Sequence, residues 1–219
     1  MRTGEAKTGY VYCGGTIGEG FLPEDRKSSY IVAADRGLVY LERHGIVPDL
    51  IVGDFDSSPE GFIDGYRSEH PETEVREFDP EKDYTDSEIG VRAAVKAGCR
   101  KVTMIGATGT RLDHVLGNLQ VLAYLESVGV SGEIIDAHNR ITIHRRSFTI
   151  RKDSQWGKYV SLFAYGGDVK GLTLRGFHYT VTDFTLSSVG SRAVSNEIDD
   201  EEGGISFTDG TLLVVESKD

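Results

Sequence analysis

Residues 50–57 read Leu-Ile-Val-Gly-Asp-Phe-Asp-Ser, an apolar run that ends in a glycine and two closely spaced carboxylates. The apolar run predicts a buried β-strand, and Gly53 lets the backbone turn where it leaves the sheet. Asp54 and Asp56 are then expected at the carboxyl end of the strand, where open α/β sheets bind their ligands. Two carboxylates so close repel each other unless a divalent cation lies between them. The same residues also suit an Asx turn at a loop entrance, so metal binding and a plain turn both stay open here.

The sequence around this stretch, from residue 10 to residue 136, alternates short apolar runs with glycine-bounded or amphipathic segments. Such alternation predicts a largely parallel sheet with helices on both faces. A capping box of Thr85 and Glu88 marks the start of one helix. Residues 61–73 are polar and predict no definite element. We expect strands over residues 10–13, 30–34, 50–53, 75–78, 102–105 and 133–136, and helices over residues 38–44, 86–97 and 112–128.

After about residue 139 the helical periodicity disappears. Short alternating runs follow, separated by glycines and by the hairpin signal Asp209-Gly210. This pattern predicts a small antiparallel β-sandwich or barrel. The predicted fold is therefore a Rossmann-like α/β domain over residues 1–140, followed by a β-sandwich domain over residues 141–219.

The formal net charge of the chain is −11, which argues against a protein that binds nucleic acid or an anionic membrane surface. An acidic enzyme that handles phosphates needs magnesium and local cations to offset its own field. Cys13 and Cys99 have neither metal-ligand nor redox spacing, so we expect small, buried residues in a reducing cytoplasm. The N-terminus has no signal-peptide core and no run reaches membrane-spanning length, which predicts a soluble, cytoplasmic protein.

Acidic residues recur at the ends of predicted strands and the starts of predicted helices in the first domain. In a parallel sheet these positions lie along one edge, so residues distant in sequence converge there. A single such residue is ordinarily a helix cap, but a row of them requires cations. Mg²⁺ held by carboxylates and nucleotide phosphates fits this chemistry. The row consists of Asp35, Asp54, Asp56, Asp83, Asp86 and Asp113.

Residues 106–114, Gly-Ala-Thr-Gly-Thr-Arg-Leu-Asp-His, follow a predicted strand and begin the clearest predicted helix. The glycines allow the backbone to approach an anion, and the helix N-terminus presents free N–H groups to it. Arg111 adds a fixed positive charge suited to phosphate oxygens. The segment is neither a Walker A loop nor a dinucleotide fingerprint, because the required lysine and glycine spacings are missing. We therefore predict a phosphate contact here, with His114 on the polar side of the helix.

Three segments occur in the order and approximate spacing of the thiamine pyrophosphokinase family, which the chain resembles from about residue 10 to its end. They are residues 53–57 (GDFDS), 82–86 (KDYTD) and 109–114 (GTRLDH), and residues 33–35 and 195–196 also match. The resemblance implies an α/β nucleotide domain followed by a β-sandwich, in agreement with the pattern. It also implies a homodimer with sites at the subunit interface, where the first domain of one subunit and the second domain of the other hold thiamine.

The resemblance further implies roles for single residues. Asp54, Asp56 and Asp86 would be the magnesium ligands, and Asp113 would line the same site. The family pattern is broken at Arg36, where glycine is usual, and residues 199–202 are unusually acidic. Trp156 lies outside the matched segments and is expected to pack in the core or an interface. The residues implied to contact ATP or thiamine are Asp35, Lys82, Thr108, Gly109, Arg111, Ser195 and Asn196.

The implied reaction transfers a pyrophosphoryl group from ATP, the co-substrate, to the hydroxyl of thiamine, with Mg²⁺ as cofactor and AMP as leaving group. Asp113 is a candidate acceptor for the hydroxyl proton, a role that the sequence does not separate from metal or substrate contact. Two alternatives remain. A magnesium-dependent aspartyl-phosphate phosphohydrolase would use Asp54 as nucleophile, although its lysine-bearing segment is not evident. A catalytically silent thiamine- or nucleotide-binding protein would lack acidic ligands that are all present here.

Overall fold

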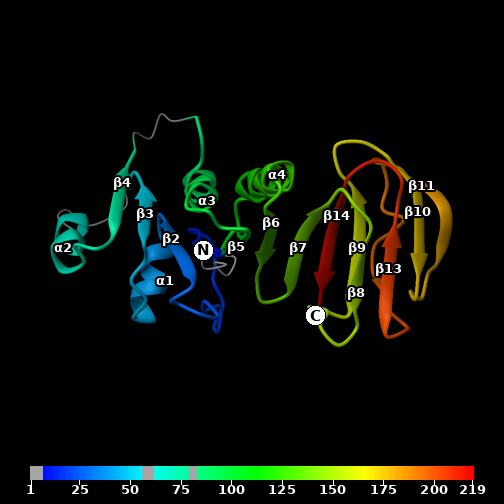
Figure 1. The fold of residues 1–219 in the computed structure, drawn as a ribbon, viewed down its shortest axis with the longest axis horizontal. Coiled ribbons are helices and arrows are strands. Elements are labelled where there is room, and N and C mark those ends of the chain that lie inside the picture. Colours follow the sequence, from blue (N-terminus) through cyan, green and yellow to red (C-terminus); the bar gives the residue numbers. More distant parts are fainter. Residues whose placement is uncertain (1–6, 56–61, 79–82) are drawn as a thin grey trace, which may run out of the picture. The chain divides into compact units, whose positions relative to one another are not determined.

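The computed structural model describes residues 7–55, 62–78 and 83–219 (Figure 1). It divides the chain into two compact units, with the division between Gly132 and Glu133. The sequence places its own boundary near residue 140, inside the first hairpin of the antiparallel region. Among the described helices, none is both long and apolar enough to cross a membrane.

The first unit contains five parallel strands in the order β5-β1-β2-β3-β4. The chain therefore adds strands on one side of β1 as far as β4, and then returns to place β5 on the other side. This reversal creates a topological switch point between β1 and β5, the place where open α/β sheets bind ligands. The strands are β1 (Thr8–Tyr12), β2 (Ser29–Ala34), β3 (Leu50–Gly53), β4 (Glu74–Glu77) and β5 (Lys101–Ile105).

Helices connect most of these strands. They are α1 (Gly37–Arg43), α2 (Phe62–Glu69), α3 (Asp86–Lys96) and α4 (Leu112–Ser127). Helix α3 packs on β1, β2, β3 and β5, and it also lies beside α4 (Figure 1). Helix α3 packs across several strands, and its N-terminus lies towards their carboxyl ends. Residues 84–85, which directly precede α3, are therefore close to the same edge of the sheet.

The core of the first unit consists of the apolar strand residues. Burial on both sides is what continuous apolar runs in a parallel sheet require. Burial of β1, β2, β3 and β5 leaves their ends available to ligands, whereas the edge strand β4 is partly exposed. The fully buried side chains include Val11, Ile31, Val32, Leu50, Ile51, Val52, Val102 and Met104, each 0 % exposed.

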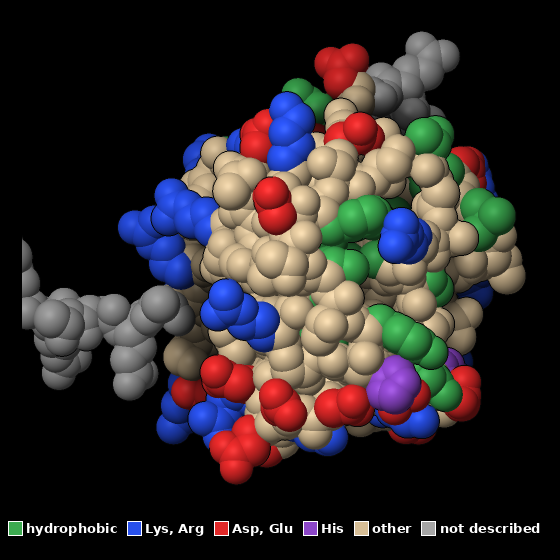
Figure 2. Space-filling model, turned by 90° about the vertical axis from the view of Figure 1, so that its right-hand side faces the viewer, with side chains coloured by type: hydrophobic (Ala, Val, Ile, Leu, Met, Phe, Trp, Pro, Cys, Tyr) green, Lys and Arg blue, Asp and Glu red, His purple; other side chains and the backbone are tan. Residues whose placement is uncertain are grey.

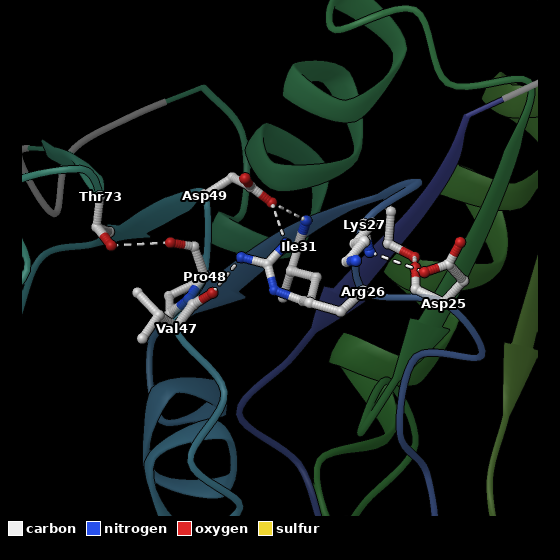
Figure 3. A network of polar contacts seen from close by, with 9 residues as sticks. Asp25, Arg26, Lys27, Ile31, Val47, Pro48, Asp49 and Thr73 are labelled. Atoms are coloured by element: carbon white, nitrogen blue, oxygen red, sulfur yellow. Dashed lines mark hydrogen bonds and ion pairs between the residues drawn. The ribbon is translucent and has the colours of Figure 1, made fainter. Parts of the chain in front are cut away.

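A polar network fixes the amino end of β3 (Figure 3). Asp49 Oδ2 accepts hydrogen bonds from Ile31 N at 2.7 Å and from Arg26 Nη1 at 3.3 Å. Thr73 Oγ1 donates to Pro48 O at 2.8 Å, which ties the residues before β4 to the same corner. These bonds satisfy backbone groups where the strands begin, and so they hold the register that carries Asp54 to the opposite end.

The second unit is formed by antiparallel strands. In one sheet the order is β12-β9-β14-β7-β6, and in the other it is β11-β10-β13-β8. The hairpin predicted at Asp209-Gly210 does not form: this turn connects β13 to β14, but the two strands belong to different sheets and pair with other strands. The strands are β6 (Ser131–Ile135), β7 (Asn139–His144), β8 (Phe148–Arg151), β9 (Tyr159–Ala164), β10 (Val169–Arg175), β11 (Val181–Leu186), β12 (Asn196–Glu197), β13 (Glu202–Ser206) and β14 (Leu212–Ser217).

A continuous hydrophobic core lies between these two sheets, as in a β-sandwich. On the outer face of the protein shown in Figure 2, apolar side chains lie among many charged ones. Tyr179 and Val189 of this unit are 66 % and 84 % exposed. The core contains Ile150, Val160, Leu162, Val169, Leu172, Leu174, Phe177, Leu186, Ile198, Ile205, Leu212 and Val214.

Candidate active site

Two loops meet at the switch point between β1 and β5. Gly15 N donates to Gly106 O at 2.9 Å, and Cys13 N donates to Ile105 O at 2.7 Å. A Cβ at Gly15 would collide with the carbonyl oxygens of Gly106 and Thr108, so only glycine allows this approach. The loop that the sequence predicts to contact phosphate is therefore packed against a second glycine-containing loop.

The loop after β5 is held from below by a buried side chain of the helix that follows. Asn118 Nδ2 donates to Ala107 O at 2.7 Å, and Asn118 is 6 % exposed. Arg111 occupies the N-cap of α4 but makes no side-chain capping bond. The N-cap residue thus contributes no side-chain bond at the start of α4, where the N–H groups of a helix can bind an anion.

Arg111 and Asp113 form an exposed ion pair at the start of α4. Arg111 Nε donates to Asp113 Oδ1 at 3.2 Å, and Nη2 donates to Oδ2 of the same carboxylate. The hydrogen bond from Arg111 lowers the pKa of Asp113, and Asp113 in turn raises the pKa of Arg111. Both groups are therefore ionised at neutral pH, with a guanidinium held near the glycine loop.

Carboxylates follow the next two strands along the edge. Asp35 comes directly after β2, and its N–H donates to Val52 O at 2.9 Å. Asp54 comes directly after β3, as predicted. A Cβ at Gly53 would lie 2.7 Å from Asp35 Oδ1, so the Asp35 carboxylate is directed towards the end of β3. The structure thus brings Asp35 to the same part of the edge as Asp54.

Left-handed backbone conformations gather in these segments. Among the described residues, four that are not glycine have a positive φ: Asp35 (50°), Phe55 (54°), Asp183 (49°) and Ser195 (57°). Three of the four lie within or directly beside the sequence segments predicted to carry function. Strain of this kind persists only where the surroundings impose it, and it is common at ligand sites.

Helix α3 brings another predicted acid to this region. Asp86 is its first residue, and Thr85 caps it by accepting a hydrogen bond from Glu88 N at 3.3 Å. The side chain of the next residue, Ser87, interacts with the thiol of Cys13, which directly follows β1. Burial raises the pKa of the Cys13 thiol to about 12, so Cys13 is not a nucleophile. The start of α3 accordingly lies over the carboxyl end of β1.

Three other predicted site residues are not placed at this edge by the described part of the structure. Asp56 and Lys82 lie outside the described residues, and Asp83 is exposed. Within residues 7–55, 62–78 and 83–219, no group of three or more His, Cys, Asp or Glu is arranged to hold a metal ion. The magnesium triad of Asp54, Asp56 and Asp86 therefore remains a prediction.

In the second unit, Ser195 and Asn196 have different surroundings. Asn196 is 5 % exposed; its Nδ2 donates to Tyr179 O at 2.8 Å and its Oδ1 accepts from Tyr179 N at 2.9 Å. Ser195 is exposed, left-handed, and fixed by a bond from its N–H to Ser161 Oγ at 3.0 Å. Asn196 therefore holds the loop in place, and Ser195 is the side chain of the two that a ligand can reach.

Sequence reasoning missed two parts of the edge in the first unit. Gly14 and Gly15 come one residue after the end of β1, and a glycine pair after an apolar run was the available signal. Arg36 is exposed, and a Cβ at Gly14 would lie 3.8 Å from its backbone nitrogen. The backbone of Arg36 thus lies beside the β1 loop, a proximity that only the strand order reveals.

These features define a class: a two-unit protein in which an α/β unit carries a glycine-rich, acidic ligand edge and a β-sandwich unit follows. Residues 24–131 match the family model "Thiamin pyrophosphokinase, catalytic domain", and residues 145–212 match "Thiamin pyrophosphokinase, vitamin B1 binding domain". The chain is 31 % identical over 189 residues to thiamine pyrophosphokinase of Bacillus subtilis (strain 168), covering 86 % of this chain and 87 % of that protein.

Solved structures agree with these matches. The crystal structure of thiamine pyrophosphokinase from B. subtilis has a TM-score of 0.87 at 30 % identity, over 97 % of this chain and 100 % of that chain. The corresponding structure from Geobacillus thermodenitrificans has a TM-score of 0.82 at 33 % identity, over 97 % and 98 % of the two chains. The chain belongs to the thiamine pyrophosphokinase family.

Proposed function

We propose that this protein is a thiamine diphosphokinase, which transfers a diphosphate group from ATP to the hydroxyl of thiamine and releases AMP. The observation that carries the proposal is the meeting of the β1 and β5 loops at the switch point, within a chain of this family. That position is where an α/β sheet binds a nucleotide, and the start of α4 is suited to its phosphates. Family membership does not favour the phosphohydrolase alternative.

In the proposed reaction the thiamine hydroxyl oxygen attacks the β-phosphorus of ATP. A new O–P bond forms while the bond from the β-phosphorus to the bridging α,β-oxygen breaks, and its electron pair leaves with AMP. The protein mainly positions the reactants and offsets their charge. Arg111 and the backbone of the glycine loop are suited to steady the phosphates, with Thr108 and Gly109 beside them.

Asp113 is less suited to accept the hydroxyl proton than the sequence alone suggests. Its pKa is lowered by Arg111, and a carboxylate of low pKa is a weak general base. We therefore assign Asp113 to orienting Arg111. The other carboxylates of this edge are then the candidate acceptors for the hydroxyl proton.

Carboxylates at the ends of β2 and β3 and at the start of α3 fit a magnesium ion, because Mg²⁺ prefers hard oxygen ligands. We propose that Asp54, Asp56 and Asp86 hold it, with Asp35 nearby. When bound, Mg²⁺ would neutralise part of the negative charge of the phosphates. Lys82 is proposed to lie near the nucleotide.

We also propose that the protein is a homodimer with sites at the subunit interface, where Ser195 contacts thiamine and Asn196 holds its loop. Exposed apolar side chains support an interface: Leu112 and Leu116 on α4 are 73 % and 63 % exposed. Both cysteines are free and buried, which supports the proposed cytoplasmic location.

The test is to incubate the protein with thiamine, ATP and Mg²⁺ and to separate the products by chromatography. We expect thiamine diphosphate and AMP in equal amounts, and neither without thiamine. Release of inorganic phosphate without thiamine would favour the phosphohydrolase instead. Thiamine binding without AMP would indicate the silent binding protein.

A further inference from the structure

Arg92 lies between two tyrosines that belong to different elements. It is on α3, and its guanidinium carbon lies 4.5 Å from the centre of the Tyr84 ring and 4.1 Å from the centre of the Tyr124 ring. Tyr124 is on α4, whereas Tyr84 precedes α3 by two residues. Both distances are within the range of cation–π attraction. The guanidinium thus links the segment before α3 to a neighbouring helix.

Glu88 holds this guanidinium in place. Arg92 Nε and Nη2 both donate to Glu88 Oε1, at 2.9 Å and 2.7 Å. The same glutamate donates its backbone N–H to the capping Thr85 Oγ1 at 3.3 Å. Glu88 therefore fixes both the start of the helix and the arginine that contacts Tyr84.

These contacts hold the two residues that directly precede Asp86 in the chain. Tyr84 is held by Arg92 and Thr85 by Glu88, so the backbone entering Asp86 has a fixed direction. Asp86 itself is partly buried at the first position of α3. Small errors in the position of a metal ligand weaken the site, and supporting contacts prevent them.

We propose that Arg92 is a positioning residue, which orients the carboxylate of Asp86 towards the metal–nucleotide complex by clamping Tyr84 against Tyr124. The inference rests on the proposed function. An ordinary helix-stabilising ion pair four residues apart would contribute to folding only. If Arg92 is a positioning residue, its loss weakens the binding of Mg²⁺ and nucleotide. If Arg92 contributes to folding only, its loss leaves both affinities unchanged.

Two variants remove the clamp in different ways. Arg92→Met keeps a long side chain against the rings but loses the charge, and Tyr124→Leu removes the ring contributed by the neighbouring helix α4. Arg92→Lys keeps the charge, and we expect it to retain part of the affinity for Mg²⁺ and nucleotide. Arg151→Met is the matched control, because Arg151 also pairs with a carboxylate through Nε and Nη2 but lies exposed in the second unit.

The first readout is binding of α,β-methylene-ATP with Mg²⁺, measured by calorimetry. This analogue cannot transfer its diphosphate, so binding is seen apart from turnover. We expect both Arg92→Met and Tyr124→Leu to weaken this binding about three- to tenfold, as loss of cation–π contacts implies. The Mg²⁺ concentration for half-maximal activity should rise by the same factor, while thiamine binding stays near wild type and the melting temperature falls by only a few degrees.

Other outcomes contradict the inference. Wild-type affinity for Mg²⁺ and the analogue in Arg92→Met and Tyr124→Leu would leave Arg92 with a folding role only. Equal loss of thiamine and nucleotide binding would show a general disturbance of the fold. Failure of the proposed function itself is distinguishable, since wild-type protein would then bind no analogue and form no AMP.

Discussion

Asp54 is the residue on which the proposed chemistry most depends, and it lies at the end of the buried strand β3. Asparagine has nearly the same shape but no negative charge, so Asp54→Asn removes the proposed metal ligand without changing packing. We expect AMP formation to fall at least about 100-fold, as loss of an ionic group at the reacting phosphates implies. The measurement is the initial rate of AMP release at saturating thiamine and Mg²⁺-ATP.

Asp64→Asn is the control for this change. Asp64 is 83 % exposed on α2, and its ion pair within the described part of the chain is with the nearby Arg67, at 3.3 Å. Its variant should keep wild-type activity, and both variants should keep the wild-type circular dichroism spectrum. Near-normal turnover of Asp54→Asn would remove the metal role from Asp54.

His144 in the second unit gives stability a pH dependence. Burial, and secondly the positive charge of Arg140, lower the pKa of His144 from 6.5 to about 4. The ring is stacked on Phe148 with centroids 3.9 Å apart, and Nε2 lies 2.9 Å from Thr142 Oγ1. The folded protein therefore favours neutral imidazole, whereas the unfolded chain takes up a proton below its own pKa.

The sign follows from this difference. The contribution of His144 is fully present above pH 6.5 and is lost as the pH falls from 6.5 to about 4. We expect the free energy of unfolding of wild type, relative to His144→Gln, to fall by about 2–3 kcal/mol between pH 7.5 and pH 4.5. Urea unfolding at the two pH values measures it, and parallel losses in both proteins would contradict the assignment.

At the scale of elements, the placement of β3 depends on its amino end. Asp49→Ala leaves the buried Ile31 N–H without its acceptor and frees Arg26 (Figure 3). An unsatisfied buried donor costs about 1–3 kcal/mol, so Asp49→Ala should lower the free energy of unfolding by that amount. Asp49→Asn keeps an acceptor oxygen and should lose less than about 1 kcal/mol. Urea unfolding compares the three proteins, and equal losses in both variants would show that the charge, not the acceptor, matters.

Elements with a strong local signal were predicted well from the sequence. The buried run before Asp54 forms β3, and α3 begins at Asp86 with the predicted cap of Thr85 on Glu88 N. The reciprocal half of the capping box does not form as expected, because the Glu88 carboxylate pairs with Arg92. Local chemistry decides such positions, and tertiary partners then compete for the same groups.

Elements without a local signal were not predicted. Residues 61–73 gave no definite element, yet α2 forms over Phe62–Glu69 and buries Tyr66 to 6 % exposure. In α4 the helical spacing was right, but Leu112 and Leu116 are exposed while the polar Asn118 is buried beneath the glycine loop. Burial here depends on where the helix meets the rest of the unit, which periodicity does not contain.

The candidate site shows the same limit. Strand ends carrying Asp35 and Asp54 followed from the alternation of apolar runs. The neighbouring positions of β1 and β5 did not, because these strands are far apart in sequence and pair only in the folded sheet. The place of Gly15 in the candidate site therefore follows only from its contact with Gly106 in the folded sheet.

At the scale of the whole molecule, the proposed dimer makes a prediction about activity that no single chain can show. If each site combines the first unit of one subunit with the second unit of its partner, then damage to different units falls on different sites. Asp54→Asn damages the first unit. Ser195→Arg places bulk and positive charge at the exposed Ser195, and so should repel the cationic ring of thiamine.

Each variant alone should be inactive, but a mixture in which subunits exchange should recover activity. In a hybrid dimer one site receives both damaged units and the other receives both intact ones. Random exchange makes half of the dimers hybrid, each with one of its two sites intact, so about a quarter of wild-type activity is expected. Mixing Asp54→Asn with the Asp54→Asn, Ser195→Arg double variant is the control, because its hybrids contain no intact first unit. If native mass spectrometry shows hybrids but AMP release stays at the control level, each site must lie within a single chain.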